Sequence, residues 1–413
     1  MLRAYRYRLY PTDDQRRQMT RIVGCCRFTW NRLLEYCGKS YERRKDSHTA
    51  FDLNNFIAHT LKPAYPWLTD APAQTLQCVS ADLTSAFKAF FRGDSGYPKF
   101  KTKHRSRRSF RIPQKGKVDV DGDRIYVQGV GWVDAVLHRK PKGRLRNITV
   151  TVNPSGSVYA SCLFEDGVEA PVPEVPRKPK VLGIDLNLGR LAVCSDGVEY
   201  GNPRTLKQYE KKLRHKQKLL SKKCKGSNNW KKLKHEMAVL HEKIANIRKD
   251  SIHKMTKRMV CDSQADVIVV EDLNVSGMMR NHKLAKHIQD ASFFEVRRQL
   301  GYKCLWYGKT LVIADRFFAS SRTCSNCGWH NDGLTLGDRQ WECPVCHTRH
   351  DRDRNAALNL ESFGLKALAG DAGEVKPLEM PSVDDRAATH LRSMASVKEE
   401  KEHGYSMEAS RLA

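Results

Sequence analysis

Two closely spaced pairs of cysteines are the feature that most constrains the fold of this chain. Cys324 and Cys327 form one C-x-x-C pair, and Cys343 and Cys346 form a second pair after fifteen intervening residues. Four thiolates at this spacing can surround one zinc ion tetrahedrally, and such all-protein sites are structural. A redox function is disfavoured because the C-x-x-C pair occurs twice. The sequence therefore predicts a closed zinc site in this region.

Other potential metal ligands follow no comparable pattern. His347 and His350 could replace a thiol as a ligand, but a full set of four cysteines makes this unnecessary, so we expect them to pack or to contact nucleic acid. The nine remaining cysteines are scattered without regular pairing through a large basic chain. This distribution is typical of ordinary buried thiols and not of a disulfide framework.

The charge balance indicates a polyanionic partner. The chain has 413 residues, with 73 Lys and Arg against 46 Asp and Glu, which leaves a net charge of +27. The length predicts more than one domain, and the charge exceeds what solubility alone requires. No stretch approaches the roughly 20 apolar residues of a membrane-spanning helix, and the start of the chain lacks the apolar core of a signal peptide. Nucleic acid in the cytoplasm is therefore the expected partner.

The first half of the chain has alternating helical and strand-like patterns. Residues 2–9 alternate small or apolar residues with arginines, which predicts a strand. Thr12 and Gln15 form a capping-box signature that opens a helical region. Short alternating pieces separated by Gly, Pro, Asn and Asp then predict a β-rich unit over 110–168, which can also recruit the first strand. Four prolines within 169–180 indicate a linker.

The second half begins with alternation typical of two or three antiparallel strands over 181–201. Apolar spacing over 206–260, interrupted by KGSNNW, predicts two helices in a hairpin. Short buried strands are expected at 266–273 and 311–315. The polar tail after about residue 366 is expected to be weakly ordered.

Two basic regions are candidates for contact with phosphate. The predicted hairpin carries 18 Lys and Arg against four Asp and Glu, whereas a solvated helix face normally carries more acids. Residues 99–111 are also rich in Lys and Arg, with aromatic residues between them, and could equally be a solvated loop. In so basic a chain, release of counterions from a phosphate backbone is the favoured interpretation. The candidate contacts are Lys99, Lys101, Lys103, Arg107 and Arg108 in the segment 99–111, together with Arg3 and Arg6 in the predicted first strand.

Three acidic residues lie in apolar surroundings far apart in the sequence. Asp185 lies in VLGIDL, Glu271 follows VIVV, and Asp353 lies where a helix of Ala and Leu begins. Each one alone could be a helix cap or the partner of an arginine, because a lone buried charge is costly. Together they could converge on two magnesium ions for cleavage of a phosphodiester. Asp351 is a rival for Asp353, and whichever of the two does not face the site is free to cap the helix or pair with an arginine.

The segments GIDLN, VVEDL and DRNAALN, with the cysteine-rich insert before the third, resemble the split RuvC nuclease domain of the TnpB (OrfB-type) family of insertion sequences. YRYRLYPTDDQ, YPWLTDAPAQTLQ and GYPKFKTK with SFRIP resemble the same family, so the resemblance covers about residues 3–362. It assigns the family's catalytic acids to Asp185, Glu271 and Asp353, and none of these positions departs from the pattern.

The resemblance implies a multi-domain mixture of α+β and α/β folds. An RNase H-like RuvC core with an inserted zinc ribbon is expected, together with amino-terminal β-barrel-like (wedge) and helical recognition domains. The implied divisions are a wedge domain over 1–12 and 110–176, a helical domain over 13–109, a RuvC-like domain over 177–320 and 347–366 that includes a helical hairpin over 205–260, a ribbon over 321–346 and a disordered tail over 367–413.

The resemblance also implies an RNA-guided DNA endonuclease with two catalytic magnesium ions and one structural zinc ion. Its expected partners are a guide RNA and a DNA target with a short flanking motif, double-stranded and with one strand displaced; no membrane is involved. One chain per guide RNA and a cytoplasmic, nucleoid-associated location in a prokaryote are favoured. Three alternatives remain open: a compact type V CRISPR effector, a catalytically silent RNA-guided repressor, and a transposase that joins DNA ends.

Overall fold

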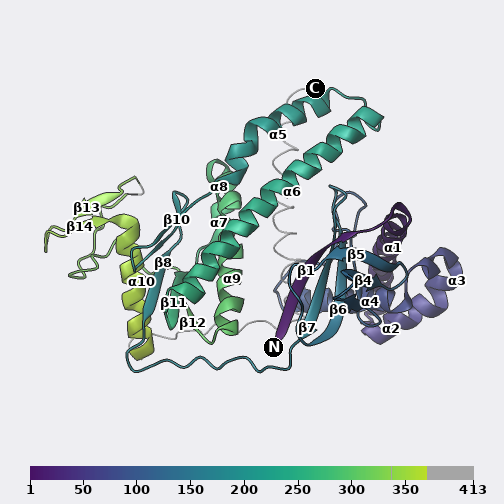
Figure 1. Ribbon diagram of the computed structural model, residues 1–413, viewed down its shortest axis with the longest axis horizontal. Helices are drawn as coiled ribbons and strands as arrows, with labels where there is room; N and C mark the ends of the chain where they lie inside the picture. The colour runs from purple at the N-terminus through teal and green to yellow at the C-terminus, as the bar shows by residue number, and fades with distance from the viewer. Residues whose placement is uncertain (336, 370–413) are drawn as a thin grey trace. The chain divides into compact units, whose positions relative to one another are not determined.

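The computed structural model describes residues 1–335 and 337–369, and these divide into two compact units, 1–168 and 169–369 (Figure 1). The boundary between the units lies at the start of the predicted linker. The tail predicted for 367–413 lies outside the described residues, except for its first three residues, which end a helix.

A seven-stranded antiparallel sheet forms one part of the first unit, in the order β2-β6-β7-β1-β5-β4-β3. The first strand pairs with β7 on one side and β5 on the other, which confirms that it is recruited by the later β-rich segment. The strands are β1 (Leu2–Tyr10), β2 (Ser109–Ile112), β3 (Lys117–Asp119), β4 (Arg124–Val127), β5 (Gly131–Val136), β6 (Arg144–Val152) and β7 (Val158–Glu165).

The helices of the first unit share one hydrophobic core with this sheet. The predicted capping box is confirmed, because Thr12 Oγ1 accepts from the Gln15 amide at 3.3 Å and Gln15 Oε1 accepts from the Thr12 amide at 3.0 Å. The helical elements are α1 (Asp13–Arg44), α2 (Ala50–Phe56), η1 (Ile57–Leu61), α3 (Lys62–Ala64), η2 (Pro66–Asp70) and α4 (Ala73–Phe91).

A five-stranded sheet in the order β10-β9-β8-β11-β12 forms the centre of the second unit. Its first three strands pair antiparallel, as the sequence predicts for 181–201, and β8, β11 and β12 pair in parallel. The strands are β8 (Val181–Asp185), β9 (Arg190–Cys194), β10 (Glu199–Gly201), β11 (Val267–Glu271) and β12 (Thr310–Ala314).

Helices cover both faces of this sheet, which explains why its parallel strands are apolar at almost every position. On one face Val267 and Val269 pack with residues of the last helix, such as Leu360. On the other face Ile268 and Val270 pack with residues of the central helices. The helical elements are α5 (Thr205–Ser221), α6 (Asn228–Lys257), η3 (Arg258–Asp262), α7 (Val275–Met279), α8 (His282–Ala291), α9 (Phe293–Trp306) and α10 (Arg352–Ala369).

The predicted helical hairpin is confirmed. Helices α5 and α6 pack on each other through a small core that contains Leu213, Leu240 and Ile244. The cysteine-rich segment follows β12 and contains a two-stranded ribbon, β13 (Gln340–Glu342) with β14 (Arg349–Asp351). Among the described helices, none is both long enough and apolar enough to cross a membrane.

Candidate functional site

Asp185 and Glu271 end adjacent parallel strands and face the same side of the sheet. Ile184 is in register with Val270, so the next residues, Asp185 and Glu271, lie side by side at the carboxyl edge of β8 and β11. Side chains alternate along a strand. Because Val267 and Val269 face α10, Glu271 faces it too, and the same alternation along β8 directs Asp185 to that side.

Helix α10 runs along β8 in the opposite direction and begins at this edge (Figure 1). A Cβ on Gly364 would lie 2.8 Å from Val181, and a Cβ on Gly183 would lie 2.1 Å from the carbonyl oxygen of Ala357. Four helical residues rise about 6 Å, close to the roughly 6.6 Å spanned by two strand residues. Starting from the contact between Ala357 and Gly183, one step of this size leads to Asp353 on the helix and to Asp185 on the strand.

Asp185 is 8 % exposed, and its surroundings disfavour the charged form. Burial, together with the negative charges of Glu271 and Asp353, raises its pKa to about 7. Asn187 Nδ2 opposes this shift by donating to Asp185 Oδ2 at 2.9 Å. The three carboxylates are therefore close enough to interact electrostatically, although they are far apart in the sequence.

Glu271 is half-buried, and burial raises its pKa. The hydroxyl of Ser320 donates to Glu271 Oε1 and partly offsets that rise. Asp353 is 5 % exposed and has three arginines around it: Arg190 at 3.0 Å, Arg339 at 3.4 Å and Arg352 at 3.6 Å.

Asp351, the rival of Asp353, acts as the cap of α10. Its Oδ1 accepts from the amides of Asp353 at 3.1 Å and Arg354 at 3.0 Å. Its two oxygens also accept from Arg190 at 2.9 and 2.8 Å. Arg190 thus bridges the capping carboxylate and the buried carboxylate of Asp353, and it fixes the start of the helix.

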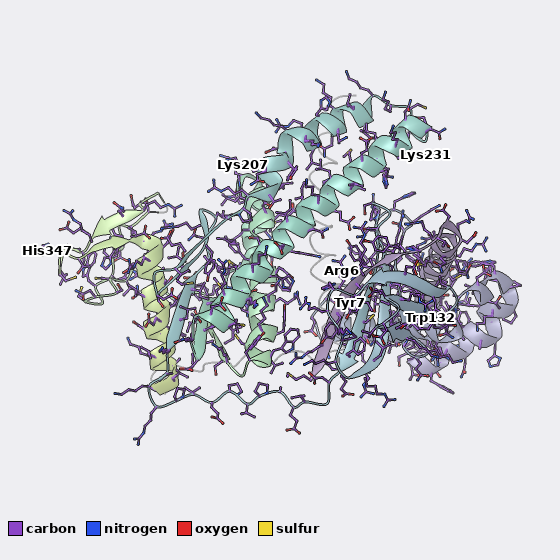
Figure 2. The ribbon with its side chains drawn as sticks, in the orientation of Figure 1. Arg6, Tyr7, Trp132, Lys207, Lys231 and His347 are labelled. Carbon is purple, nitrogen blue, oxygen red and sulfur yellow. The ribbon has the colours of Figure 1, made fainter. Side chains whose placement is uncertain are left out.

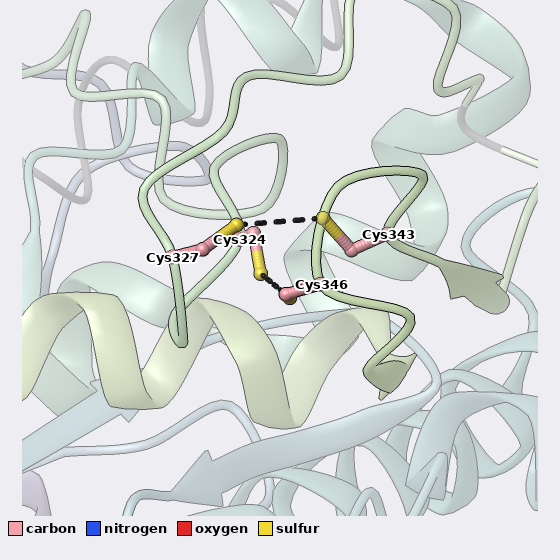
Figure 3. Close-up of side chains that lie close together, drawn as sticks. All are labelled: Cys324, Cys327, Cys343 and Cys346. Carbon is pink, nitrogen blue, oxygen red and sulfur yellow. Dashed lines mark hydrogen bonds between the residues drawn. The ribbon is translucent and has the colours of Figure 1, made fainter.

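The four cysteines form a compact group (Figure 3). Their sulfur atoms all lie within 4.8 Å of one another, with Cys324 and Cys346 3.6 Å apart and Cys327 and Cys343 3.5 Å apart. Four thiols in so small a volume fit one tetrahedral zinc ion. Within the described part of the chain, no other set of three or more such ligands is equally compact, so the three carboxylates are less tightly gathered than the thiols.

The two histidines near the thiols differ in their surroundings. His350 is buried, its Nε2 lies 3.1 Å from Cys324 Sγ, and its ring packs on Trp341 at 4.7 Å. His347 is exposed on the loop before β14 (Figure 2). Neither belongs to the compact group, so packing explains His350, and contact with nucleic acid stays a prediction for His347.

Two asparagines on α10 join the cysteine-rich segment to the helix. Asn359 Nδ2 donates to the carbonyls of Ser320 at 2.7 Å and Thr323 at 2.6 Å. Asn355 Nδ2 donates to Thr323 at 2.7 Å, and its Oδ1 accepts from the Ser325 amide at 2.9 Å. The chain that leads into the first cysteine pair is therefore fixed to the helix that carries Asp353.

The candidate nucleic-acid contacts in the first unit have different surroundings. Arg6 is exposed and lies over the ring of Tyr159 at 3.8 Å, next to the buried Tyr7 (Figure 2), whereas Arg3 pairs with Asp166 at 3.0 Å. Lys101 Nζ lies 3.5 Å from the ring centroid of Trp30, and burial lowers the pKa of Lys101 to about 8. The others are exposed or half-buried: Lys99, Lys103, Arg107 and Arg108.

The surface of the α5–α6 hairpin is strongly basic. Lys207 and Lys231 extend from the first turns of the two helices (Figure 2), and both are exposed. Glu210 pairs with Arg214 and Lys286, and Glu236 pairs with Lys216 at 2.5 Å. Because the hairpin has only four acids, even complete pairing would leave most of its 18 basic residues uncompensated.

Several residues that support the carboxylates are not evident from the sequence. Arg190, Asn187 and Ser320 each contact a carboxylate, and Asn359 holds the cysteine-rich segment. Asn187 is two residues from Asp185, which is the spacing of a local side-chain bond, so this contact could have been anticipated. The contacts of Arg190 and Ser320 span 163 and 49 residues, and no local pattern indicates them.

Three family models match parts of the chain. Residues 157–282 match OrfB_IS605, described as "Probable transposase". Residues 293–360 match a Cas12f1-like TNB domain, and residues 1–46 match the helix-turn-helix domain model of OrfB_IS605 proteins. Together these models span most of the described residues.

Two curated relatives match over nearly their whole length. A Streptomyces pristinaespiralis protein named as an RNA-guided DNA endonuclease is 33% identical over 390 residues, 94% of this chain and 95% of the relative. InsQ of Escherichia coli (strain K12), named in the same way, is 33% identical over 393 residues, 89% of this chain and 94% of the relative.

Solved structures share the fold at low sequence identity. A Cas12f1 chain, solved by cryo-EM in a complex with sgRNA and target DNA, has a TM-score of 0.52 at 18% identity and covers 84% of this chain and 81% of its own. The mini-RNA-guided endonuclease CRISPR-Cas_phi3 has a TM-score of 0.50 at 10% identity, with 92% and 94% covered.

Proposed function

The chain belongs to the TnpB (OrfB-type) family, and on that premise we propose that it is a transposon-encoded, RNA-guided DNA endonuclease of RuvC type. It binds a guide RNA, recognises a short motif beside the target and cleaves the DNA. Base pairing with the guide supplies sequence specificity, and the protein supplies charge, recognition of the motif and chemistry. We further propose that it acts in the cytoplasm with one chain per guide RNA.

The meeting of three carboxylates at one edge of the second sheet carries this proposal. Asp185 and Glu271 lie at the ends of neighbouring strands, and the charges of Glu271 and Asp353 both raise the pKa of Asp185. Burial and the charges of its neighbours disfavour the charged form of Asp185, and the arginines around Asp353 offset this only in part. Carboxylate oxygens that repel one another in this way are suited to bind hard divalent cations such as magnesium.

Asp185, Glu271 and Asp353 would hold two magnesium ions, which supply an activated water and stabilise the departing oxygen. Asn187 and Ser320 orient the carboxylates by donating to them, and Arg190 holds the start of α10. The four cysteines would hold one zinc ion, whose part is structural because a full thiolate set leaves no open position.

We propose that the basic hairpin and the basic residues of the first unit bind phosphate. Candidate residues on the hairpin are exposed lysines, including Lys207 and Lys231. In the first unit Arg6, Lys99, Lys103, Arg107 and Arg108 are the accessible candidates. Lys101 is a weaker candidate because its ammonium group is buried over Trp30.

Asp185→Ala and Glu271→Ala should abolish cleavage while RNA binding is retained, because these residues are expected to bind metal and not RNA. The protein is purified with its bound RNA, and the RNA is sequenced. A plasmid library that carries the matching target beside a randomised flanking motif is then incubated with the protein in magnesium. Cleavage by either variant at more than about a thousandth of the wild-type rate would remove the assignment.

Asp351→Asn is the matched control, two residues from Asp353. Asparagine also caps helices, so this variant should retain most of the activity, whereas Asp353→Asn should lose it. The reverse result would transfer the catalytic role to Asp351. The sequenced RNA also separates the two sources of guide, because a transposon guide derives from the end of the element and a CRISPR guide from an array.

A further inference from the structure

Two consecutive phenylalanines follow β12 and differ sharply in exposure. Phe318 is half-buried and packs against the core between the sheet and α10, with its ring 5.0 Å from that of Phe363. Phe317 is 89% exposed, more than any other large hydrophobic side chain among the described residues. Single exposed apolar residues are common on protein surfaces, so exposure alone implies nothing. Phe317 is of interest because its loop lies beside Glu271, one of the three proposed metal ligands.

The loop that carries Phe317 is fixed to Glu271 at both ends. Ala314 is in register with Glu271 where β12 ends, and Ser320 donates its hydroxyl to the Glu271 carboxylate. Phe317 is three positions along the chain from each of these residues, and three residue steps span at most about 10 Å. Phe317 therefore lies within about 10 Å of the proposed catalytic edge, a distance that one or two nucleotides of a bound strand can span.

Internal hydrogen bonds define the course of this loop. Asp315 Oδ1 accepts from the Phe317 amide at 2.8 Å, and the Asp315 carbonyl accepts from the Phe318 amide at 3.1 Å. The Phe318 carbonyl accepts from the Ser320 amide at 2.8 Å. With Phe318 anchored in the core, this turn directs Phe317 towards solvent.

Two arginines lie beside the loop. Asp272, which follows Glu271, pairs with Arg316 at 2.7 Å and with Arg297 at 2.5 Å. The carboxylates of Asp272 and Asp315 balance the charge of these two guanidinium groups. An aromatic ring beside arginines is an arrangement by which proteins bind single-stranded nucleic acid, with bases stacked on the ring and phosphates near the arginines.

We propose that Phe317 stacks on a base of the DNA strand held at the carboxylate edge and so positions the scissile phosphate. This inference rests on the proposed endonuclease function. It assigns to Phe317 a contact with substrate and no part in metal binding. Because every base offers a π face, the contact is independent of sequence, as cleavage specified by a guide requires.

The test compares Phe317→Ala, Phe317→Leu and Phe317→Trp in the protein purified with its RNA. Alanine and leucine remove the ring, and we expect cleavage at saturating target to slow by roughly tenfold, within the range seen when a stacking residue is truncated. Tryptophan keeps a ring and should cleave within about threefold of the wild-type rate. Binding of target DNA in buffer without divalent cations should change less than about threefold in every variant.

Tyr307→Ala is the control, because Tyr307 is a 54% exposed aromatic residue of the same unit that precedes β12 at the opposite edge of the sheet. It should cleave like the wild type. A direct readout is the fluorescence of 2-aminopurine placed at successive positions along each strand of the target DNA. The wild type and Phe317→Trp should quench one position that the alanine and leucine variants do not quench.

Equal cleavage and equal quenching by Phe317→Ala and the wild type would overturn the inference and leave the endonuclease proposal intact. A wild type that fails to cut but quenches through Phe317 would overturn the endonuclease proposal and leave the stacking contact standing. As a further arm, 2-aminopurine is placed in the guide RNA. If Phe317→Ala loses quenching only of this RNA probe, the ring contacts the guide and the inference is also overturned.

Discussion

At the scale of single residues, the buried carboxylate of Asp185 makes stability depend on pH. Its pKa rises from near 3.8 to about 7 on folding, mainly through burial. The folded protein therefore binds this proton more tightly than the unfolded chain does. The contribution of Asp185 to stability is therefore greatest below about pH 4, declines as the pH rises from about 4 to 7, and is lowest above pH 7.

Asp185→Asn should therefore be more stable than the wild type above pH 7 in buffer without added magnesium. The neutral amide avoids the desolvation cost, and we expect its Tm to be higher by roughly 2 to 6 °C at pH 8. The difference should shrink towards pH 5, where the wild-type carboxyl becomes protonated. Thermal unfolding measured at several pH values checks this, and a pH-independent difference would contradict it.

The residues that support the carboxylates illustrate a limit of sequence reasoning at this scale. Asp185 and Glu271 are evident from the sequence, because a charge inside an apolar run is locally unusual, whereas the family resemblance is what favours Asp353 over Asp351. Arg190 and Ser320 occupy ordinary positions in a strand and a loop. Their contacts with Asp353 and Glu271 come from elements that are brought together only by folding.

At the scale of elements, the contact between α10 and β8 depends on Gly183. A Cβ there would lie 2.1 Å from the Ala357 carbonyl oxygen and 2.5 Å from the Glu361 nitrogen, both in the backbone of α10. Backbone cannot move aside as a flexible side chain can. The helix approaches the strand this closely because position 183 has no side chain.

Gly183→Ala should lower both stability and cleavage, because α10 must shift away from β8 and take Asp353 with it. Overpacking of this kind costs about 1–3 kcal/mol or more, so we expect Tm to fall by at least roughly 3 °C. Gly201→Ala is the control, since no atom lies within 4 Å of its added Cβ. Normal cleavage by Gly183→Ala would show that the position of α10 tolerates this change.

Zinc removal should act on the same helix from its other side. Cys327→Ser should reduce bound zinc from one ion per chain to none and slow cleavage at least roughly tenfold, with RNA binding retained. The reason is that Asn355 and Asn359 tie the chain entering the first cysteine pair to α10. Metal analysis and cleavage assays measure both effects, and Cys224→Ser, an exposed cysteine of the hairpin, is the control.

At the scale of the whole molecule, the net charge of +27 predicts binding that is sensitive to salt. A protein that contacts six to ten phosphates loses about a thousandfold or more in affinity between 50 and 200 mM salt. We expect a loss of this size for double-stranded DNA, measured by fluorescence anisotropy. A nearly flat salt dependence would contradict the assignment of the basic surfaces to phosphate.

Replacing Lys211, Lys212 and Lys218 with glutamine should reduce the salt slope by up to roughly one unit per contact removed. These hairpin lysines are exposed, and the neighbouring acid Glu210 already pairs with Arg214 and Lys286. Lys254→Gln is the control on the same hairpin, because Lys254 already pairs with Asp250 at 2.7 Å. An equal effect from Lys254→Gln would show that the salt dependence follows the total charge of the protein and not the position of the lysines.

The sequence by itself determined the local features of this protein. Periodicity indicated the strands of the second sheet, the helical hairpin and the first strand, and spacing indicated the four zinc ligands, because these signals arise among near neighbours. Tertiary structure alone decided which carboxylates meet and what holds them. The capping role of Asp351, the burial of Asp353, the bridge made by Arg190 and the exposure of Phe317 beside Phe318 all depend on how α10 and β12 pack. Packing joins residues far apart in the chain, and no local pattern records such contacts.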